Sequence, residues 1–280
     1  MTLIRLLTIL LIPLFFLGCF QSETIVHVKP DGSGTIEETS LFSRFAVESM
    51  QKMGKDLQQA MEDTRTENKA EEKDPQQEMI REAPSKAGQY GPGVKFLSAV
   101  PVSTDNLVGY KAVYTFEDIN TLQINQKPDN KIGSPGEKPE KPGKAEIIRF
   151  KMSKGPVANL TVILPDPKDE KDGQKEKEKD PAPKKADPQA EEMMKTLFKD
   201  MSVKVALKIE GTIIKTNATH LNKKELTLFE INFGKLLENP KVLEKLSSSQ
   251  PKTIEEMKRM AKGIEGLKVE MNNPVFVDFK

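Results

Sequence analysis

Apolar and polar residues alternate in pairs of short segments along the chain, which is the pattern of β-hairpins. Residues 24–29 and 35–41 alternate on either side of Pro30 to Gly34, where Asp-Gly favours a tight turn. Further alternating segments lie at 93–100 and 110–116, 145–152 and 157–164, 203–215 and 225–233, and 274–279. Hairpins without a regular strand–helix alternation predict an α+β fold with a largely antiparallel sheet.

Four segments replace this alternation with a helical period. The clearest is 43–61, where apolar residues recur at spacings of three and four and Ser43 suits the N-cap position. Three more helices are expected, at 190–201, 235–246 and 253–264. We therefore expect residues 19–280 to form a single α+β domain, with amphipathic helices packed on the sheet.

Three charged stretches interrupt this domain, from about Arg65 to Gln89, Gln126 to Lys144, and Pro165 to Pro188. They are rich in Glu, Lys, Gln and Pro. Such sequence buries too little apolar surface to offset the entropy lost on ordering, so we predict long, disordered, solvated insertions. The third stretch has an alternative as a transient charged helix, because Glu and Lys are good helix formers.

The N-terminal residues have the pattern of a bacterial lipoprotein signal. Arg5 precedes an apolar core at residues 6–17, and Gly18 and Cys19 follow it. The core is shorter than the roughly 20 residues of a spanning helix. We predict that residues 1–18 are a signal peptide, that cleavage falls between Gly18 and Cys19, and that the Cys19 thiol is lipidated. The alternative is an uncleaved anchor helix followed by a chance cysteine.

The motif around Cys19 resembles the lipobox, although Phe16 stands where that motif prefers Leu. Several acyl chains together hold a protein stably on a membrane, and no later apolar run reaches spanning length. The expected membrane attachment is therefore through acylated Cys19. Phe20 and Gln21 follow the cysteine in place of Asp. By resemblance to sorting signals in enterobacteria, this predicts the outer membrane of the cell envelope.

Composition narrows the classes of partner. The chain has 43 basic and 42 acidic residues, so no strong attraction to nucleic acid follows. Cys19 is the single cysteine, which excludes disulfides and thiolate metal sites within the monomer. Trp is absent and aromatic residues make up 6% of the chain, which disfavours a carbohydrate-stacking platform.

Catalytic and cofactor motifs are missing from the sequence. There is no Gly-rich phosphate loop, nucleophile elbow or HExxH-type metal motif, so we predict no enzyme activity, no cofactor and no metal. Asp31 and Ser33 lack the further oxygen ligands of a cation site and fit a turn better. Glu117 and Asp118 are adjacent, so in a strand they would face opposite ways, and a helix start explains them better.

Imidazole is available only at His27 and His220, and neither has a carboxylate at a fixed motif spacing. We expect His220 in a polar surface turn. A hydrolase assembled from scattered residues remains an alternative, which alanine substitution of the two histidines would test.

Three blocks carry a resemblance to a known class: 28–34, 109–119, and 211–218 followed by 226–228. Together they resemble uncharacterised envelope lipoproteins of the mycobacterial LppM-like class. The resemblance implies an α+β domain reminiscent of lipid-binding folds, with no established catalytic residues to transfer. This chain departs from the class in lacking a C-terminal transmembrane helix and in its charged insertions.

Methionines on the predicted helices offer one functional option. Met50, Met53, Met61, Met193 and Met194 are expected in the core, as periodic apolar residues usually are. The alternative is a groove between helix and sheet that accepts an acyl chain or a partner helix. We thus expect a non-enzymatic lipid-anchored envelope protein, acting as a tethered binding or scaffold domain for an unknown protein or lipid ligand. The alternative function is binding of a lipid or other hydrophobic ligand in that groove.

Overall fold

The computed structural model describes residues 20–49, 51–52, 74–125, 147–165, 198–239 and 261–280. The predicted signal peptide, Cys19 and the five methionines of the predicted helices lie outside the described residues. So do the predicted insertion at 126–144 and, apart from Pro165, the one at 165–188.

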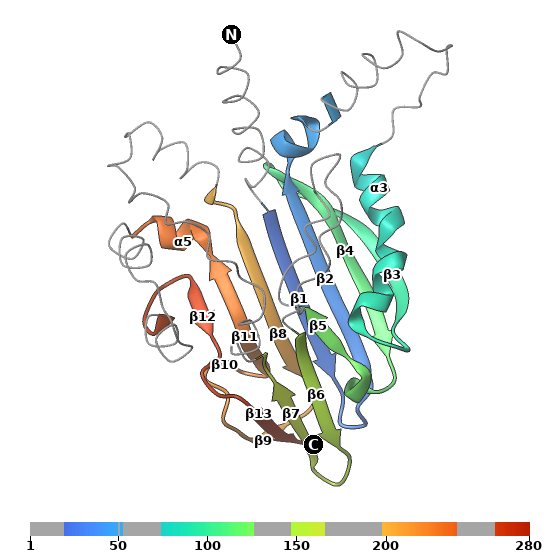
Figure 1. Cartoon of the computed structure of the whole chain (residues 1–280), viewed down its shortest axis with the longest axis vertical. Helices are drawn as coiled ribbons and strands as arrows, with labels where there is room; N and C mark the ends of the chain where they lie inside the picture. Colours follow the sequence, from blue (N-terminus) through green and yellow to red (C-terminus); the bar gives the residue numbers. More distant parts are fainter. Residues whose placement is uncertain (1–19, 50, 53–73, 126–146, 166–197, 240–260) are drawn as a thin grey trace, which may run out of the picture.

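Most of the described chain forms two β-sheets (Figure 1). The larger sheet has eight strands: β1 (Phe20–Val28), β2 (Gly34–Ser43), β3 (Lys95–Ser103), β4 (Leu107–Phe116), β8 (Ser202–Ile209), β10 (Leu221–Asn222), β11 (Glu225–Asn232) and β12 (Leu267–Val269). Their order is β10-β11-β8-β1-β2-β4-β3, and β12 pairs with β11. The smaller sheet has five strands: β5 (Gln123–Asn125), β6 (Ile147–Ser153), β7 (Ala158–Ile163), β9 (Ile213–Thr216) and β13 (Val275–Phe279). Their order is β5-β6-β7-β13-β9.

Most neighbouring strands are antiparallel, as the sequence predicts. β1 and β2 form the first hairpin, β3 and β4 the second, and β6 and β7 the third. The exception is β1 with β8, which run parallel from Gln21 opposite Ser202 to Val28 opposite Ile209. Alternation identifies a strand but not its partner, so this long-range pairing was not predicted.

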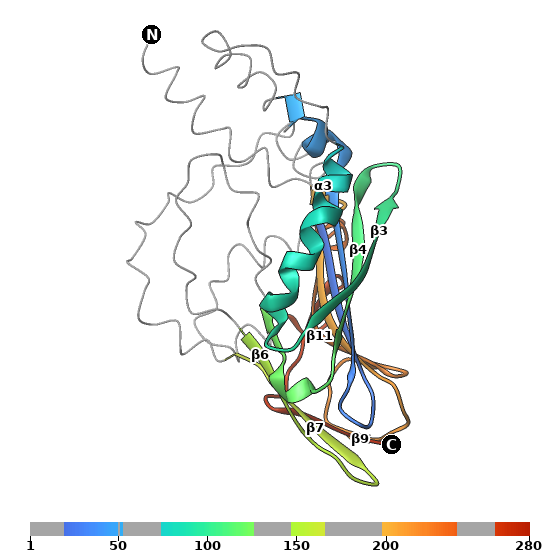
Figure 2. The ribbon, with the colours of Figure 1, turned by 90° about the vertical axis from the view of Figure 1, so that its right-hand side faces the viewer.

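The hydrophobic core lies where the two sheets face each other. Along β1 and β2, Val26, Val28 and Ile36 point to the inner face, while residues between them point outward. β6 and β7 supply Ile148 and Leu160 from the other side. Side chains of a strand alternate between faces, so this half-apolar pattern buries one face of each sheet. Figure 2 shows β6 and β7 beside the lower part of the larger sheet, at an angle to it.

A helical segment covers β3 and β4 and corrects one expectation. Residues 75–89, predicted within a disordered insertion, lie in α3 (Pro75–Glu82) and the 3-10 helix η2 (Ala83–Tyr90). Asp74 caps α3, accepting a hydrogen bond from the Gln76 backbone N–H at 3.0 Å. The Gln76 side chain donates to the backbone oxygen of Gly109 in β4 at 2.7 Å. Ala83 and Tyr90 are buried. The segment is polar on average, so the few residues that anchor it did not predict an ordered helix.

The fold is largely β, with minor helices. The predicted antiparallel pairing is confirmed, although it is divided between two sheets where one was expected. The α+β class describes the chain only in part, because the described helices are short. η3 (Ile119–Thr121) and α5 (Phe233–Leu237) are each shorter than two turns. Residues 44–49 and 51–52 are helical. Most residues of the other three expected helices lie outside the described residues. Within the described chain, no helix is long and apolar enough to cross a membrane.

Candidate functional site

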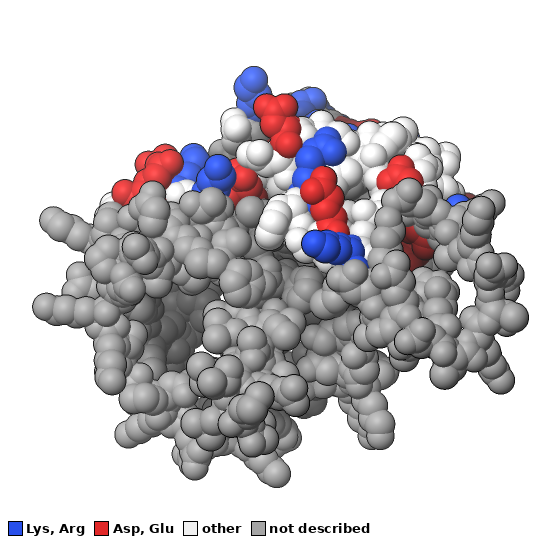
Figure 3. All heavy atoms as spheres, turned by 90° about the horizontal axis from the view of Figure 1, so that it is seen from above, with Lys and Arg blue, Asp and Glu red and all other residues white. Residues whose placement is uncertain are grey.

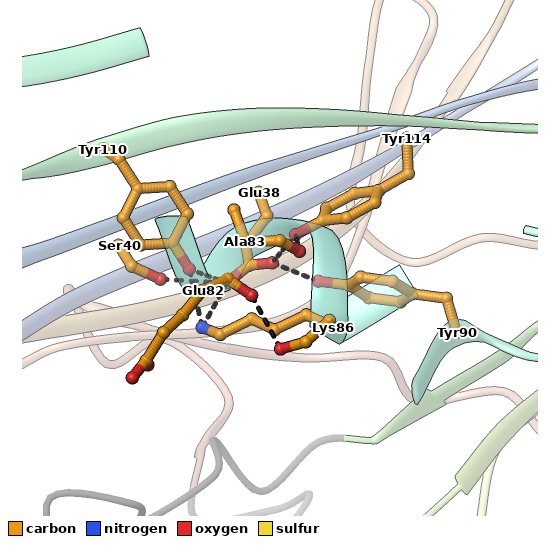
Figure 4. Close-up of polar contacts among 9 residues, drawn as sticks. Glu38, Ser40, Glu82, Ala83, Lys86, Tyr90, Tyr110 and Tyr114 are labelled. Carbon is orange, nitrogen blue, oxygen red and sulfur yellow. Dashed lines mark hydrogen bonds and ion pairs between the residues drawn. The ribbon is translucent and has the colours of Figure 1, made fainter. Parts of the chain in front are cut away.

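All three tyrosines of the chain converge on one buried carboxylate (Figure 4). Glu38 in β2 is 6% exposed. Its Oε2 accepts hydrogen bonds from the hydroxyls of Tyr90 at 2.8 Å and Tyr114 at 3.1 Å. Its Oε1 accepts one from the Tyr110 hydroxyl at 2.8 Å. We call these four residues, with Lys86 and Ser40, the Glu38 cluster.

The strand register builds half of the cluster. Glu38 lies opposite Ala112 of β4, so the diagonal neighbours on the same face are Tyr110 and Tyr114. The small Ala112 side chain leaves room above the carboxylate for two rings. Ser40, two residues along β2, points the same way and donates from Oγ to Glu38 Oε1 at 3.2 Å.

Helix η2 supplies the other half. Lys86 Nζ lies 3.1 Å from Glu38 Oε1 and 2.6 Å from the Tyr110 hydroxyl. The Tyr114 hydroxyl lies 3.0 Å from the backbone oxygen of Ala83, at the start of the helix. The Tyr90 and Tyr114 rings pack 5.1 Å apart. Side chains from β2, β4 and η2 therefore meet at one point.

Each charge in the cluster is stabilised by its partner. Burial alone would raise the pKa of Glu38, but the charge of Lys86 and the hydrogen bonds from Tyr90 and Tyr110 outweigh it, so this pKa lies below its usual value. Burial opposes the Lys86 charge in the same way, yet Glu38 raises the pKa of that ammonium. Glu38 and Lys86 thus form an ion pair at neutral pH, with the carboxylate buried and the ammonium partly exposed.

The pKa values of the three phenols are shifted away from the range in which a phenol acts as a nucleophile or base at neutral pH. Burial first, and then the negative charge of Glu38, raises the pKa of Tyr90, Tyr110 and Tyr114. A catalytic base or acid works best with a pKa near the operating pH. The cluster instead holds one fixed carboxylate, one fixed ammonium and three fixed phenols. Its chemistry suits fastening η2 to the sheet.

The residues weighed as a cation site form a turn, as predicted. Asp31 Oδ1 accepts hydrogen bonds from the Ser33 backbone N–H at 2.9 Å and the Ser33 hydroxyl at 2.7 Å. These bonds lower the pKa of Asp31. Gly32 has a φ of +83°, a backbone conformation that glycine adopts readily. The turn joins β1 to β2.

Glu117 and Asp118 are also explained by local structure. Asp118 caps η3, accepting a hydrogen bond from the Asn120 backbone N–H at 3.1 Å, which lowers the pKa of Asp118. Glu117 lies 3.3 Å from Lys95 in an exposed ion pair. The predicted helix start is confirmed at Asp118.

The two histidines have separate surroundings. On the outer face of the larger sheet, His27 Nε2 lies 3.6 Å from Glu37 and Nδ1 lies 3.7 Å from Glu210. His220 Nε2 contacts the Val269 backbone oxygen at 3.1 Å. Across the described ranges, no group of three or more His, Cys, Asp and Glu side chains is arranged to hold a metal ion.

Sequence reasoning missed the Glu38 cluster, although β2 and β4 carried a signal. Ile36, Glu38 and Ser40 share one face of β2, and Tyr110 and Tyr114 share the apolar face of β4. A buried tyrosine usually finds a hydrogen-bond partner for its hydroxyl, so two inward tyrosines call for an acceptor nearby. The contribution of η2 was hidden because residues 75–89 were expected to be disordered.

Comparison with known proteins finds a distant likeness to a solved structure. It is the NMR structure of the folded domain of the Mycobacterium tuberculosis LppM protein, with a TM-score of 0.27 and 8% sequence identity, covering 78% of this chain and 84% of that one. No protein-family model and no curated protein matches the chain. A likeness at this level assigns neither a ligand nor an activity to the chain.

Proposed function

We propose that the protein is a non-enzymatic lipoprotein of the bacterial cell envelope that acts as a tethered binding or scaffold domain. In this proposal the signal is cleaved after Gly18 and Cys19 carries the acyl chains. The observation that carries it is the sequence pattern of Arg5, the apolar core at 6–17 and the Gly18–Cys19 pair, directly before the described strand β1. Cleavage after Gly18 would leave every described strand intact.

The Glu38 cluster supports a binding or scaffold role over catalysis. Its carboxylate already accepts hydrogen bonds from five side chains, and its phenols are held protonated. A rigid sheet with a helix fastened to one face presents a fixed surface to a ligand. We propose that this ligand is a protein or a lipid of the envelope.

The outer membrane and the LppM-like class belong to this proposal. Phe20 and Gln21 after the cysteine support the location. The blocks at 28–34 and 109–119 support the class, and they form the β1–β2 turn and the strand that leads into η3. An α+β domain also belongs here, with the helices expected at 190–201 and 253–264 completing its helical part.

Acylation is tested in bacteria that express the full chain. Bacteria that express wild type or Cys19→Ser are grown with an alkyne-labelled fatty acid, and their membranes are separated from soluble protein. Wild type should carry the label and fractionate with membranes, whereas Cys19→Ser should carry none and be released. A matched control, Cys19→Ser with Ser22→Cys, restores a thiol three residues away and should also stay unlabelled. Cleaved Cys19→Ser that remained entirely on membranes would contradict the proposal.

A further inference from the structure

One end of the larger sheet gathers phenylalanines. The Phe20 and Phe42 rings pack 5.2 Å apart where β1 begins and β2 ends, and the Phe198 and Phe233 rings pack 6.2 Å apart beside the start of β8. Phe45, in the helical residues after β2, is 68% exposed. We call these five residues the phenylalanine end, which is the upper end in Figure 1.

The strand register shows that the two ring pairs share this end. Phe20 lies opposite Phe42, and the next residue of β1, Gln21, lies opposite Ser202 of β8. Ser202 in turn lies opposite Asn232 of β11, the residue before Phe233. The other end of the β1–β2 hairpin is the polar turn at Lys29 to Ser33. The two ends of the sheet therefore differ in character.

The predicted lipid attachment is next to the phenylalanine end. Cys19 directly precedes Phe20, the first residue of β1, and consecutive Cα atoms are about 3.8 Å apart. The polar layer on each side of a bilayer's hydrocarbon core is on the order of 5–8 Å thick. Acyl chains on Cys19 would thus bring Phe20 to the depth of the lipid headgroups, with no linker to hold the sheet away.

Neither sign of charge dominates the described surface at this end (Figure 3). Figure 3 views the molecule from above, towards the phenylalanine end, and acidic and basic side chains are interspersed among the described residues. The chain as a whole has a net charge of +1. Attachment through clustered basic residues depends on anionic lipid and weakens as salt is added. Because the charges of this chain are balanced, an apolar contact with the membrane fits better.

We infer that the phenylalanine end is a membrane-docking surface, and that its occupant is the bilayer that holds the acyl chains. The inference rests on the proposed function. Phe45 inserts at the boundary between headgroups and acyl chains, and the larger sheet stands on the membrane with β13 and the Lys29–Ser33 turn directed away. This orientation presents the smaller sheet to partners outside the membrane.

The absence of Trp from the chain gives a direct test. Full-length Phe45→Trp is purified in its acylated form and reconstituted into phosphatidylcholine vesicles with or without brominated acyl chains, which quench nearby Trp. The matched control is Phe276→Trp, which replaces a phenylalanine of β13 that is 38% exposed at the other end of the molecule. Mass spectrometry verifies the acyl chains, and circular dichroism verifies folding of both variants.

We expect Trp at position 45 to emit at shorter wavelength in vesicles and to lose most of its emission to brominated lipid, in low and high salt alike. Trp at position 276 should change in neither respect. Vesicle-bound protein with unquenched Trp at position 45 would overturn the docking surface but leave the anchor intact. A wavelength shift that depended on protein concentration instead of lipid would overturn it in favour of a second copy as the occupant. Equal quenching at both positions would also overturn the inference, and a chain without acyl groups would overturn it together with the proposed function.

Discussion

Lys86 Nζ lies 3.1 Å from Glu38 Oε1, and this ion pair joins η2 to β2 across 48 positions of the sequence. Glu38 is buried, whereas the Lys86 side chain is 25% exposed. The pair is therefore the charged part of an attachment that also includes three phenols. If this attachment holds η2 on the sheet, its loss should be measurable as stability.

Replacing Glu38 by Gln should lower the free energy of unfolding by about 3 kcal/mol, because removing one partner leaves the other charge unpaired in a buried site. The value lies at the low end for buried pairs because water reaches part of Lys86. Urea denaturation measures it. The control is Glu37→Gln on the outer face, which removes a half-exposed pair with Lys111 and changes the contact with His27, and should cost less than about 1 kcal/mol. Equal losses for the two variants would contradict the role assigned to Glu38.

Acid should remove the contribution of Glu38. Its pKa in the folded protein lies below the ordinary value of 4.5, so the stabilisation is complete above pH 4.5 and declines as the pH falls through the folded pKa. The difference in unfolding free energy between wild type and Glu38→Gln should therefore shrink below pH 4.5. Urea titrations at several acidic pH values measure this difference, and a constant difference down to strong acid would be evidence against the mechanism.

High pH should remove the stability that the three tyrosines contribute. Burial and the Glu38 charge raise the pKa of all three tyrosines above the ordinary 10.0, so their contribution is complete below pH 10 and is lost as the pH rises through the folded values. Near-ultraviolet absorbance of phenolate reports these residues alone, since the chain has three Tyr and no Trp. We expect phenolate to form only together with unfolding. Urea-unfolded protein provides the reference, and a phenol that titrated at its ordinary pKa in folded protein would refute the expectation.

Gly109 should tolerate no side chain. A Cβ there would lie within about 2 Å of the Ser40 backbone oxygen in the neighbouring strand, so Gly109→Ala must push β2 and β4 apart beside the cluster. We expect a loss of about 3 kcal/mol in unfolding free energy. Gly88→Ala in η2 is the control, because nothing beyond its chain neighbours and its own helix backbone lies within 4 Å of the added Cβ. Its unfolding midpoint in urea should match wild type closely, and a similar midpoint for Gly109→Ala would contradict the close approach.

The sequence determined the local elements where one pattern dominated. Asp31, Gly32 and Ser33 define their turn through bonds within three residues, so the first hairpin was predictable. The strands that carry Val26 and Ile36 were predictable for a similar reason, because alternation of side chains follows from strand geometry alone.

Tertiary structure decided what depends on distant neighbours. The parallel pairing of β1 with β8, the division into two sheets and the helical state of residues 75–90 each arise from contacts between segments far apart in the chain. Glu38 shows the physical reason. As one charged residue in a strand it predicts exposure, and its burial becomes favourable only when Tyr110 and Tyr114 from β4 and Lys86 from η2 supply the hydrogen bonds and charge that water would otherwise provide.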